Sequence, residues 1–181
     1  QVLVIGLDAT APGAEQTGID FHPGDAKRLL ILGDDAAAPA VCSILEQLPT
    51  HAAEVEAVVE VPQLARKIEA GPDGHWTDSR GNRINIRWQE RLGERGDRLA
   101  EAIEDHLHRF PLPRCQQDSP EEGPDDLLWD TPASPPQEFY SWIAGKSTMV
   151  RRLRRILVND HGVDRRHIAF MSYWRHGSAG M

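Results

Sequence analysis

Residues 29–48 read LLILGDDAAAPAVCSILEQL, and this stretch carries the clearest structural signal in the chain. It opens with Leu29 to Leu32, a continuous apolar run that is typical of a parallel strand buried on both faces. From Pro39 to Leu48 the apolar side chains recur at helical spacing, and Pro39 stands where the first turn of a helix tolerates proline. The stretch therefore predicts a buried strand, a short loop and a helix.

The same order of strand, loop and helix recurs along the rest of the chain. Further strands are predicted at Val55–Val61, Ile84–Trp88, Phe139–Ala144 and His167–Ser172, and further helices at Gln63–Glu69, Asp97–Arg109 and Ser147–Asn159. The segment Gly71–Gly81 is rich in turn residues and is expected to hold a hairpin tip. Alternation of this kind builds an open parallel sheet covered by helices on both faces, so the predicted fold class is α/β.

Two segments lie outside this alternation. Gln1–Gly6 reads as a short apolar strand, and turn dipeptides follow it, so residues 1–26 are expected to be a strand with a linker. An isolated strand cannot satisfy its edges alone, which indicates that it is cut from an upstream domain. Pro111–Pro136 holds seven prolines and no periodicity, which predicts a disordered insertion in a domain that spans residues 27–177.

The composition excludes several classes of protein. The chain has 181 residues, of which 40% are hydrophobic and 27% charged, as in a soluble globular protein. Its net charge of -8 argues against a general nucleic-acid binder. The sequence has no apolar run long enough to span a bilayer and no signal pattern. We therefore expect that the chain does not insert into a membrane and that it is cytoplasmic. The two cysteines and eight histidines show no disulfide framework and no zinc-ligand spacing, so no metal site is predicted.

Two loops, Gly33–Pro39 and Ala144–Ser147, each join a predicted strand to a predicted helix. In open α/β sheets such junctions lie at the carboxyl ends of the strands, where ligands bind and where a helix start offers free N–H groups to a phosphate. Asp34 and Asp35 have an alternative role as helix caps, since their charges would repel a pyrophosphate. Two junctions at one edge of the sheet would nevertheless form a crevice suited to a dinucleotide.

The second loop also resembles the end of the phosphate-binding loop of ATPases. Gly145 and Lys146 match that loop, but Tyr140 stands where it requires a glycine, so an ATPase is excluded. What remains is a strand-to-helix junction in which Ser147 or Thr148 is expected to cap the helix.

Aromatic and basic residues gather towards the end of the chain. Tyr173 and Trp174 beside Arg175 suit stacking on a planar ring and neutralisation of an anionic group, although packing of the aromatic rings on the core is equally consistent with the pattern. The helix at Ser147–Asn159 carries four arginines around one face. This basic face is either solvated surface or an attractor of anionic ligands.

Taken together, these motifs resemble the carboxyl-terminal half of siderophore-interacting proteins, which are relatives of ferredoxin-NADP reductases. The first loop of that family reads approximately G-D-E-T-A-L-P-A, and residues 33–40 here read GDDAAAPA. The other family segments follow in the same order: W-x-x-R at Trp88–Arg91, W-x-A-G-E-(A/S) at Trp142–Ser147, an arginine-rich helix at Arg151–Arg155, and G-Y-W-R-x-G at Ser172–Gly177. The similarity spans nearly everything from Leu29 to Gly177 except the proline-rich insertion.

The resemblance implies a ferredoxin-NADP reductase-like domain that binds NAD(P)H, with FAD held by an upstream β-barrel whose last strand is Gln1–Asp8. Glu60, at the end of the second strand, is a candidate acceptor for a ribose hydroxyl. The candidate cofactor-binding residues are therefore Gly33, Asp34, Asp35, Ala36, Pro39, Glu60, Ala144, Gly145, Lys146, Ser147, Tyr173 and Trp174. Arg175 would bind the ferric siderophore, and no residue is expected to act as an acid or base.

The match has three departures, which are Asp35-Ala36 for Glu-Thr, Lys146 for Glu, and Ser172 for Gly. The leading interpretation is an enzyme, a flavin-dependent ferric-siderophore reductase that releases iron by reduction, and the chain without its flavin domain is expected to be inactive. One alternative is a non-catalytic nucleotide-sensing or partner-binding module, and another is an interaction domain that uses the arginine-rich helix. The sequence leaves the choice between NADH and NADPH open.

Overall fold

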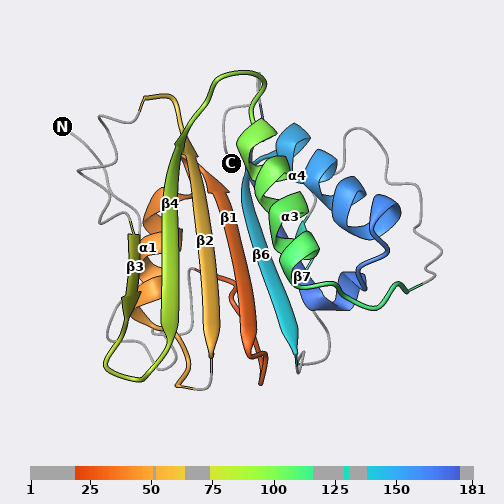
Figure 1. Ribbon diagram of the computed structural model, residues 1–181. Helices are drawn as coiled ribbons and strands as arrows, with labels where there is room; N and C mark the ends of the chain where they lie inside the picture. Colours follow the sequence, from red (N-terminus) through yellow and green to blue (C-terminus); the bar gives the residue numbers. More distant parts are fainter. Residues whose placement is uncertain (1–18, 51, 64–73, 116–128, 131–137, 176–181) are drawn as a thin grey trace, which may run out of the picture.

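The computed structural model describes residues 19–50, 52–63, 74–115, 129–130 and 138–175 (Figure 1). Its elements in chain order are β1 (Arg28–Asp34), α1 (Ala38–Glu46), β2 (Glu54–Val61), β3 (Gly74–Thr77), β4 (Arg83–Glu90), α3 (Asp97–Arg109), β5 (Trp129–Asp130), β6 (Phe139–Lys146), α4 (Ser147–Arg154) and β7 (Ile168–Trp174). A π-helical turn, Arg155–Asp160, continues α4, and a 3-10 turn, Arg165–His167, precedes β7.

Within the described residues, seven strands form one sheet in the order β3-β4-β2-β1-β6-β7-β5. The five central strands are parallel, and β3 and β5 are antiparallel to their neighbours at the two edges. Helix α1 covers one face, and α3 and α4 cover the other (Figure 1). The predicted α/β fold is therefore confirmed, with a mixed rather than wholly parallel sheet.

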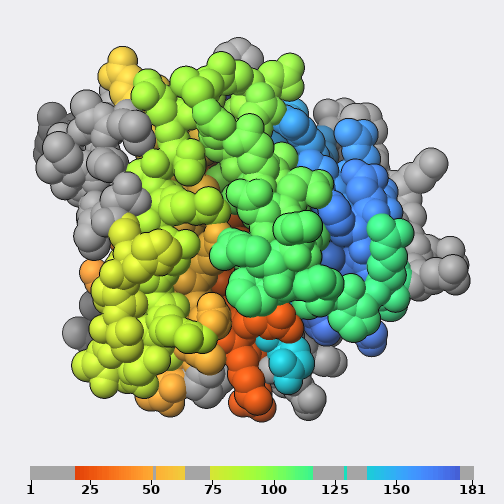
Figure 2. All heavy atoms as spheres, in the orientation of Figure 1, coloured from red at the N-terminus to blue at the C-terminus, as the bar shows by residue number. Residues whose placement is uncertain are grey.

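The helices do not cover the sheet evenly. On the face of α3 and α4, the atoms of α3 lie over the middle of the sheet, while β3 and β4 remain visible beside them (Figure 2). The apolar layer on this face includes Leu30 and Leu32 of β1, Ile103 of α3 and Leu153 of α4. Strand β1 is buried on both sides, because Leu29 and Ile31 point into the opposite layer.

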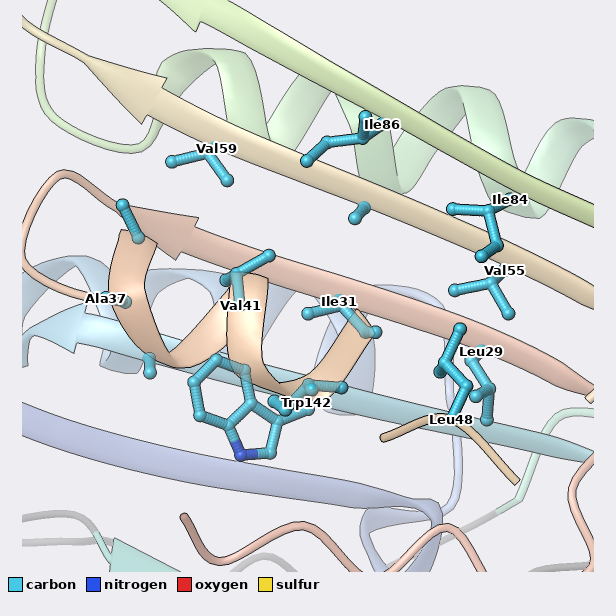
Figure 3. Close-up of a cluster of buried hydrophobic side chains, with 14 of the residues drawn as sticks. Leu29, Ile31, Ala37, Val41, Leu48, Val55, Val59, Ile84, Ile86 and Trp142 are labelled. Atoms are coloured by element: carbon cyan, nitrogen blue, oxygen red, sulfur yellow. The ribbon is translucent and has the colours of Figure 1, made fainter. Parts of the chain in front are cut away.

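The layer under α1 is built from every second residue of the central strands. Ile31 of β1, Val59 of β2, Ile86 of β4 and Trp142 of β6 pack beneath Val41 of α1 (Figure 3). Each of these side chains is at most 1% exposed. Burial on both faces explains why the central strands need continuous apolar runs rather than alternating ones.

The sequence predictions hold for β1, α1, β2, β4, α3, β6 and β7. The helix predicted at Gln63–Glu69 falls almost entirely outside the described residues. The hairpin tip is confirmed at Asp78–Asn82, where the Asp78 carboxylate accepts hydrogen bonds from the backbone of Arg80 and Asn82. Strand β3 was missed, because its four residues, GHWT, show no apolar alternation.

The prediction of a disordered insertion at Pro111–Pro136 needs correction where the structure describes it. Leu112 packs on the core, and the Cys115 N–H donates to the Gly162 carbonyl oxygen at 2.7 Å. Trp129 and Asp130 form β5 and pair with β7. So short an edge strand is held by backbone hydrogen bonds, so it leaves no apolar period in the sequence.

The described end of the predicted linker lies against the sheet. The Phe21 ring meets the edge of Tyr140 at a centroid distance of 5.5 Å, and the His22 N–H donates to the Tyr140 hydroxyl at 3.2 Å. The Trp142 indole donates to the Asp20 carbonyl oxygen at 3.1 Å. The linker therefore begins its contact with this domain before residue 27. Among the described helices, none has the length and apolar character needed to cross a bilayer.

Candidate functional site

The carboxyl ends of the parallel strands all lie at one end of the sheet, at the top of Figure 1. This end is called the carboxyl edge below, and the opposite end, where the strands begin, is called the amino edge. The register places Asp34 beside Glu60 and Gly33 beside Ala144. It also places Lys146 beside Trp174. The structure thus brings together the candidate residues Gly33, Asp34, Asp35, Ala36, Glu60, Ala144, Gly145, Lys146, Ser147 and Trp174. These residues are called the crevice below, after the crevice that the two junctions are predicted to form; the name stands for the residues.

Asp34 is the centre of the crevice, and its side chain is fully buried. Its Oδ1 accepts the Ala36 N–H at 3.0 Å. Its Oδ2 accepts the Lys146 N–H at 3.0 Å, the Arg95 guanidinium at 3.0 Å and the Trp174 indole N–H at 3.3 Å. One carboxylate therefore joins the ends of β1, β6 and β7 to the loop before α3.

The alternative role of Asp34 and Asp35 as helix caps needs correction. Helix α1 has Ala37 at its N-cap, without a side-chain hydrogen bond. Asp34 instead closes the loop before the helix, where its backbone oxygen accepts the Ala37 N–H at 2.9 Å. The expected cap of α4 by Ser147 or Thr148 is also absent, because Lys146 occupies the N-cap and α4 starts directly at the strand end.

Two glycines allow the loops to approach this closely. A Cβ atom on Gly145 would lie 2.6 Å from Cγ of Asp34, and Gly145 has a φ of 144°. A Cβ atom on Gly33 would lie 2.9 Å from Cβ of Ala37. Both positions therefore require glycine. Gly145 is required by its backbone conformation and by its contact with Asp34, and Gly33 by the close packing of β1 against the start of α1.

Two arginines outside the predicted set of site residues bind the carboxylates of the crevice. Arg91 donates to Glu60 at 2.8 Å and to Asp35 at 3.0 Å, and Arg95 pairs with both Asp34 and Asp35. Burial alone would raise the pKa of Asp35, but the hydrogen bond and charge of Arg95, with a hydrogen bond from Arg91, hold it below its usual value. The repulsion of a pyrophosphate by these carboxylates is thereby offset.

Glu60 has no exposed surface in this conformation. Its two oxygens accept the Gly96 N–H at 3.0 and 2.9 Å, and one also accepts the Arg98 N–H at 3.3 Å. Gly96 is the N-cap of α3, so Glu60 places a negative charge at the positive end of that helix. The contact with a ribose hydroxyl stays a prediction, and this conformation shows Glu60 holding the loop before α3.

The aromatic cluster divides between two environments. Tyr173 and Trp174 are the last residues of β7 rather than residues that follow it, and the pairing of β7 with β6 shifts by one residue here, so the two side chains have different surroundings. The Tyr173 ring lies 6.2 Å from the Trp142 ring and 6.1 Å from the Trp129 ring, and burial raises the pKa of Tyr173 to about 12. Tyr173 thus packs on the core, as the alternative interpretation had it.

Trp174 belongs to the crevice. Its ring has the Arg95 guanidinium at 4.9 Å and the Lys146 ammonium at 5.6 Å from its centroid. Arg175 is exposed and lies one residue beyond β7. Pro39 lies in the first turn of α1, as predicted.

The crevice therefore combines cations, an indole ring and a helix start at the carboxyl edge of a parallel sheet. Such an arrangement can bind an anionic group and a planar ring together. Its carboxylates accept hydrogen bonds from guanidinium groups or from backbone N–H groups. Among the described residues, no group of three or more His, Cys, Asp or Glu side chains is arranged to hold a metal ion.

Comparison with known proteins matches this architecture. A family model described as siderophore-interacting protein matches residues 26–177. SipS, a siderophore-interacting protein from Aeromonas hydrophila, is 24% identical, with a TM-score of 0.53 over 87% of this chain and 49% of its own. The siderophore-interacting protein from Acinetobacter baumannii is 17% identical, with a TM-score of 0.52 over 85% of this chain and 48% of its own. A siderophore utilization protein from T. fusca is 23% identical, with a TM-score of 0.53 over 86% and 48%.

At these identities the likeness to the solved structures concerns the fold. The chain spans about half the length of each of them. None of the curated proteins matches the sequence. Because the family model covers most of the chain, the chain belongs to the siderophore-interacting protein family.

Proposed function

We propose that the crevice binds NAD(P)H and that the chain is the nicotinamide-nucleotide domain of a flavin-dependent ferric-siderophore reductase. The observation that carries this proposal is the meeting of Asp34, Arg95, Lys146 and Trp174 at the carboxyl edge of the sheet. That edge is where open α/β sheets bind dinucleotides. The role in siderophore metabolism is supported by the family, and the whole protein's activity and partners are part of the proposal.

The residues present fit a nicotinamide nucleotide. Arg91 and Arg95 hold their guanidinium groups at the crevice, each with 18% of its side chain exposed, and Lys146 stands at the start of α4. These groups would hold phosphate, because charge-assisted hydrogen bonds from arginine are strong and directional. The Trp174 ring would stack on a planar group of the ligand, which would displace the Arg95 guanidinium that lies over the ring here.

The chemistry that the cofactors supply when bound is hydride transfer from NAD(P)H to FAD and one-electron reduction of ferric iron, the substrate. The contribution of this chain would be to hold the nucleotide at the crevice and to orient it towards the flavin domain. Asp34 would keep the β1 and β6 loops in place, since it binds backbone N–H groups in both. Arg175, exposed beyond β7, would meet the anionic ferric siderophore.

A non-catalytic nucleotide-sensing or partner-binding module is the second candidate. It is favoured by one observation, that Arg95 already lies on Trp174 and on two carboxylates, so a ligand must displace an existing network. A sensing module would retain nucleotide binding without delivering electrons. The two candidates therefore differ in turnover, not in binding.

The decisive test is calorimetric titration of the chain with NADH and NADPH, followed by an assay of ferric-siderophore reduction after it is joined to a flavin-binding domain. We expect Arg95→Gln to weaken nucleotide binding about tenfold or more, because a charged partner of the phosphate is lost. Arg166→Gln is the control, since Arg166 pairs with Asp164 on the surface, away from the crevice. Absence of binding by either nucleotide rejects the proposal, whereas binding without reduction favours the sensing module.

A further inference from the structure

A cavity of about 390 Å³ lies at the amino edge, the end of the sheet opposite the crevice. It lies between the first residues of β2, the hairpin of β3 and β4, and the last turn of α3. Figure 2 shows a recess there, in which the orange atoms of β2 are seen between the yellow-green β3 and β4 and the green α3. The volume falls within the range of small-molecule sites. The proposed nucleotide function makes no use of this cavity.

One carboxylate of the cavity lining, that of Glu56, accepts three hydrogen bonds. Glu56 of β2 is 6% exposed, and it accepts hydrogen bonds from His106 Nδ1 at 2.8 Å, from Arg109 at 2.6 Å and from Arg87. Burial would raise the pKa of Glu56, but the His106 hydrogen bond and the neighbouring positive charges lower it. Glu56 therefore orients the cations around it through three side-chain hydrogen bonds.

The two arginines that line the cavity come from different elements. Arg83 of β4 pairs with Glu54, and Arg109 of α3 pairs with Glu56 and with the carbonyl oxygen of Asp105. Each guanidinium uses one of its terminal nitrogens for these pairs, and its other terminal nitrogen has no partner among the described residues. Guanidinium groups that keep free N–H donors are suited to bind a carboxylate or phosphate group.

The charges of the cavity lining are matched. Arg83 pairs with Glu54 and Arg109 pairs with Glu56. Arg87 does not line the cavity, but it also pairs with Glu56 and so adds one positive charge next to the site.

We propose that this cavity binds a small organic anion, whose carboxylate or phosphate group lies between Arg83 and Arg109 and whose apolar part lies against Phe110. The Phe110 ring lines the cavity and carries the Arg109 guanidinium at 5.5 Å from its centroid. The ligand would be distinct from the nucleotide, because the crevice lies at the other edge of the sheet. This site is independent of the proposed reductase function, so either can fail without the other.

The test is an NMR titration of the 181-residue chain with phenyl phosphate, benzoate and the neutral amide benzamide. We expect an anionic ligand to shift the amide resonances of the cavity residues, and the Arg83→Gln and Arg109→Gln double variant to weaken binding about tenfold or more. Arg166→Gln is the matched control, because Arg166 and Arg83 each have 68% of the side chain exposed and each pair with one carboxylate. The relative affinities of phenyl phosphate and benzoate identify which anion the site prefers.

Four outcomes of this titration would overturn the proposal. Equal binding of benzamide and the anions, unchanged binding by the double variant, or no shift of cavity resonances would each overturn the proposal. Displacement of phenyl phosphate by saturating NADPH would also overturn it, because the cavity would then belong to the nucleotide site. The single variant Arg83→Gln is included because loss of Arg109 could disturb the fold, whereas Arg83 is largely exposed. We expect this single variant to weaken anion binding about threefold or more.

Discussion

The two edges of the sheet hold carboxylates and arginines in different ways. At the carboxyl edge, Asp34 and Glu60 accept backbone N–H groups as well as guanidinium groups. At the amino edge, Glu56 accepts hydrogen bonds from side chains alone. A carboxylate that binds backbone N–H groups fixes the path of a loop, whereas one that binds only side chains leaves its partners able to turn towards solvent. The carboxyl edge is therefore built as a rigid site and the amino edge as an adaptable one.

The largest expected effect comes from removing the backbone anchor at the carboxyl edge. Asp34→Ala should lower the free energy of unfolding by about 3–5 kcal/mol, because it removes one of the two carboxylate partners of Arg95 and leaves the backbone N–H groups of Ala36 and Lys146 without their acceptor. Chemical denaturation of the variant and the parent measures this difference. Asp164→Ala, which removes a cap from an exposed 3-10 turn, is the control and should cost much less. Equal losses in the two variants would contradict a special role for Asp34.

The second test adds a methyl group at each edge. Gly145→Ala should destabilise the fold by about 2–4 kcal/mol, because the new Cβ would overlap Asp34 and because alanine is strained at a φ of 144°. Gly81 lies in the hairpin turn of the amino edge with a φ of 87° and no atom within 4 Å of an added Cβ. Gly81→Ala should therefore cost only the backbone strain, about 1–2 kcal/mol. Denaturation curves give the free energy of unfolding of each variant, and the difference between their losses measures the cost of the overlap with Asp34.

Much of the fold was predictable because burial on both faces leaves a direct trace in the sequence. Strand β1 and helix α1 were found from an apolar run, helical spacing and Pro39. Strand β5 was not found, because a short edge strand is held by backbone hydrogen bonds that any residue can make. The elements that the sequence could not predict are those whose stability comes from the neighbouring strand rather than from their own side chains.

The candidate site was predicted in outline but not in its charges. Gly33, Asp34 and the second junction meet as expected, since carboxyl ends of parallel strands share an edge. Arg91 and Arg95 were missed as site residues, because their place depends on the path of the loop between β4 and α3. Tyr173 and Trp174 are adjacent in the sequence, and the sequence does not reveal the register shift at the end of β7 that gives them different surroundings.

The third test concerns acid at the amino edge. The pKa of Glu56 is lowered from an ordinary value of 4.5, so the ionised group contributes stability above about pH 4.5 that is lost as the pH falls through its folded-state value. Glu56→Gln should cost about 1–3 kcal/mol at pH 7, less than Asp34→Ala, because Arg87 and Arg109 can reach water when their partner is lost. It should also flatten the decline of stability between pH 5 and pH 3. Urea denaturation across this range measures both, and an unchanged slope would show that Glu56 binds its proton alike in both states.

The smallest expected effect comes from an arginine at the amino edge, compared with an arginine at the carboxyl edge. Arg83 has 68% of its side chain exposed and a single partner, so Arg83→Gln should change the free energy of unfolding by less than about 1 kcal/mol, and salt should erase the change. Arg95 has 18% of its side chain exposed and binds Asp34 and Asp35 beneath the Trp174 ring, so Arg95→Gln should cost about 1–3 kcal/mol and keep most of that cost in salt. Denaturation at low and high ionic strength distinguishes the two. Similar, salt-sensitive losses would mean that the carboxyl edge is as adaptable as the amino edge, and that Arg95 is free to leave Trp174 without disturbing the loops around it.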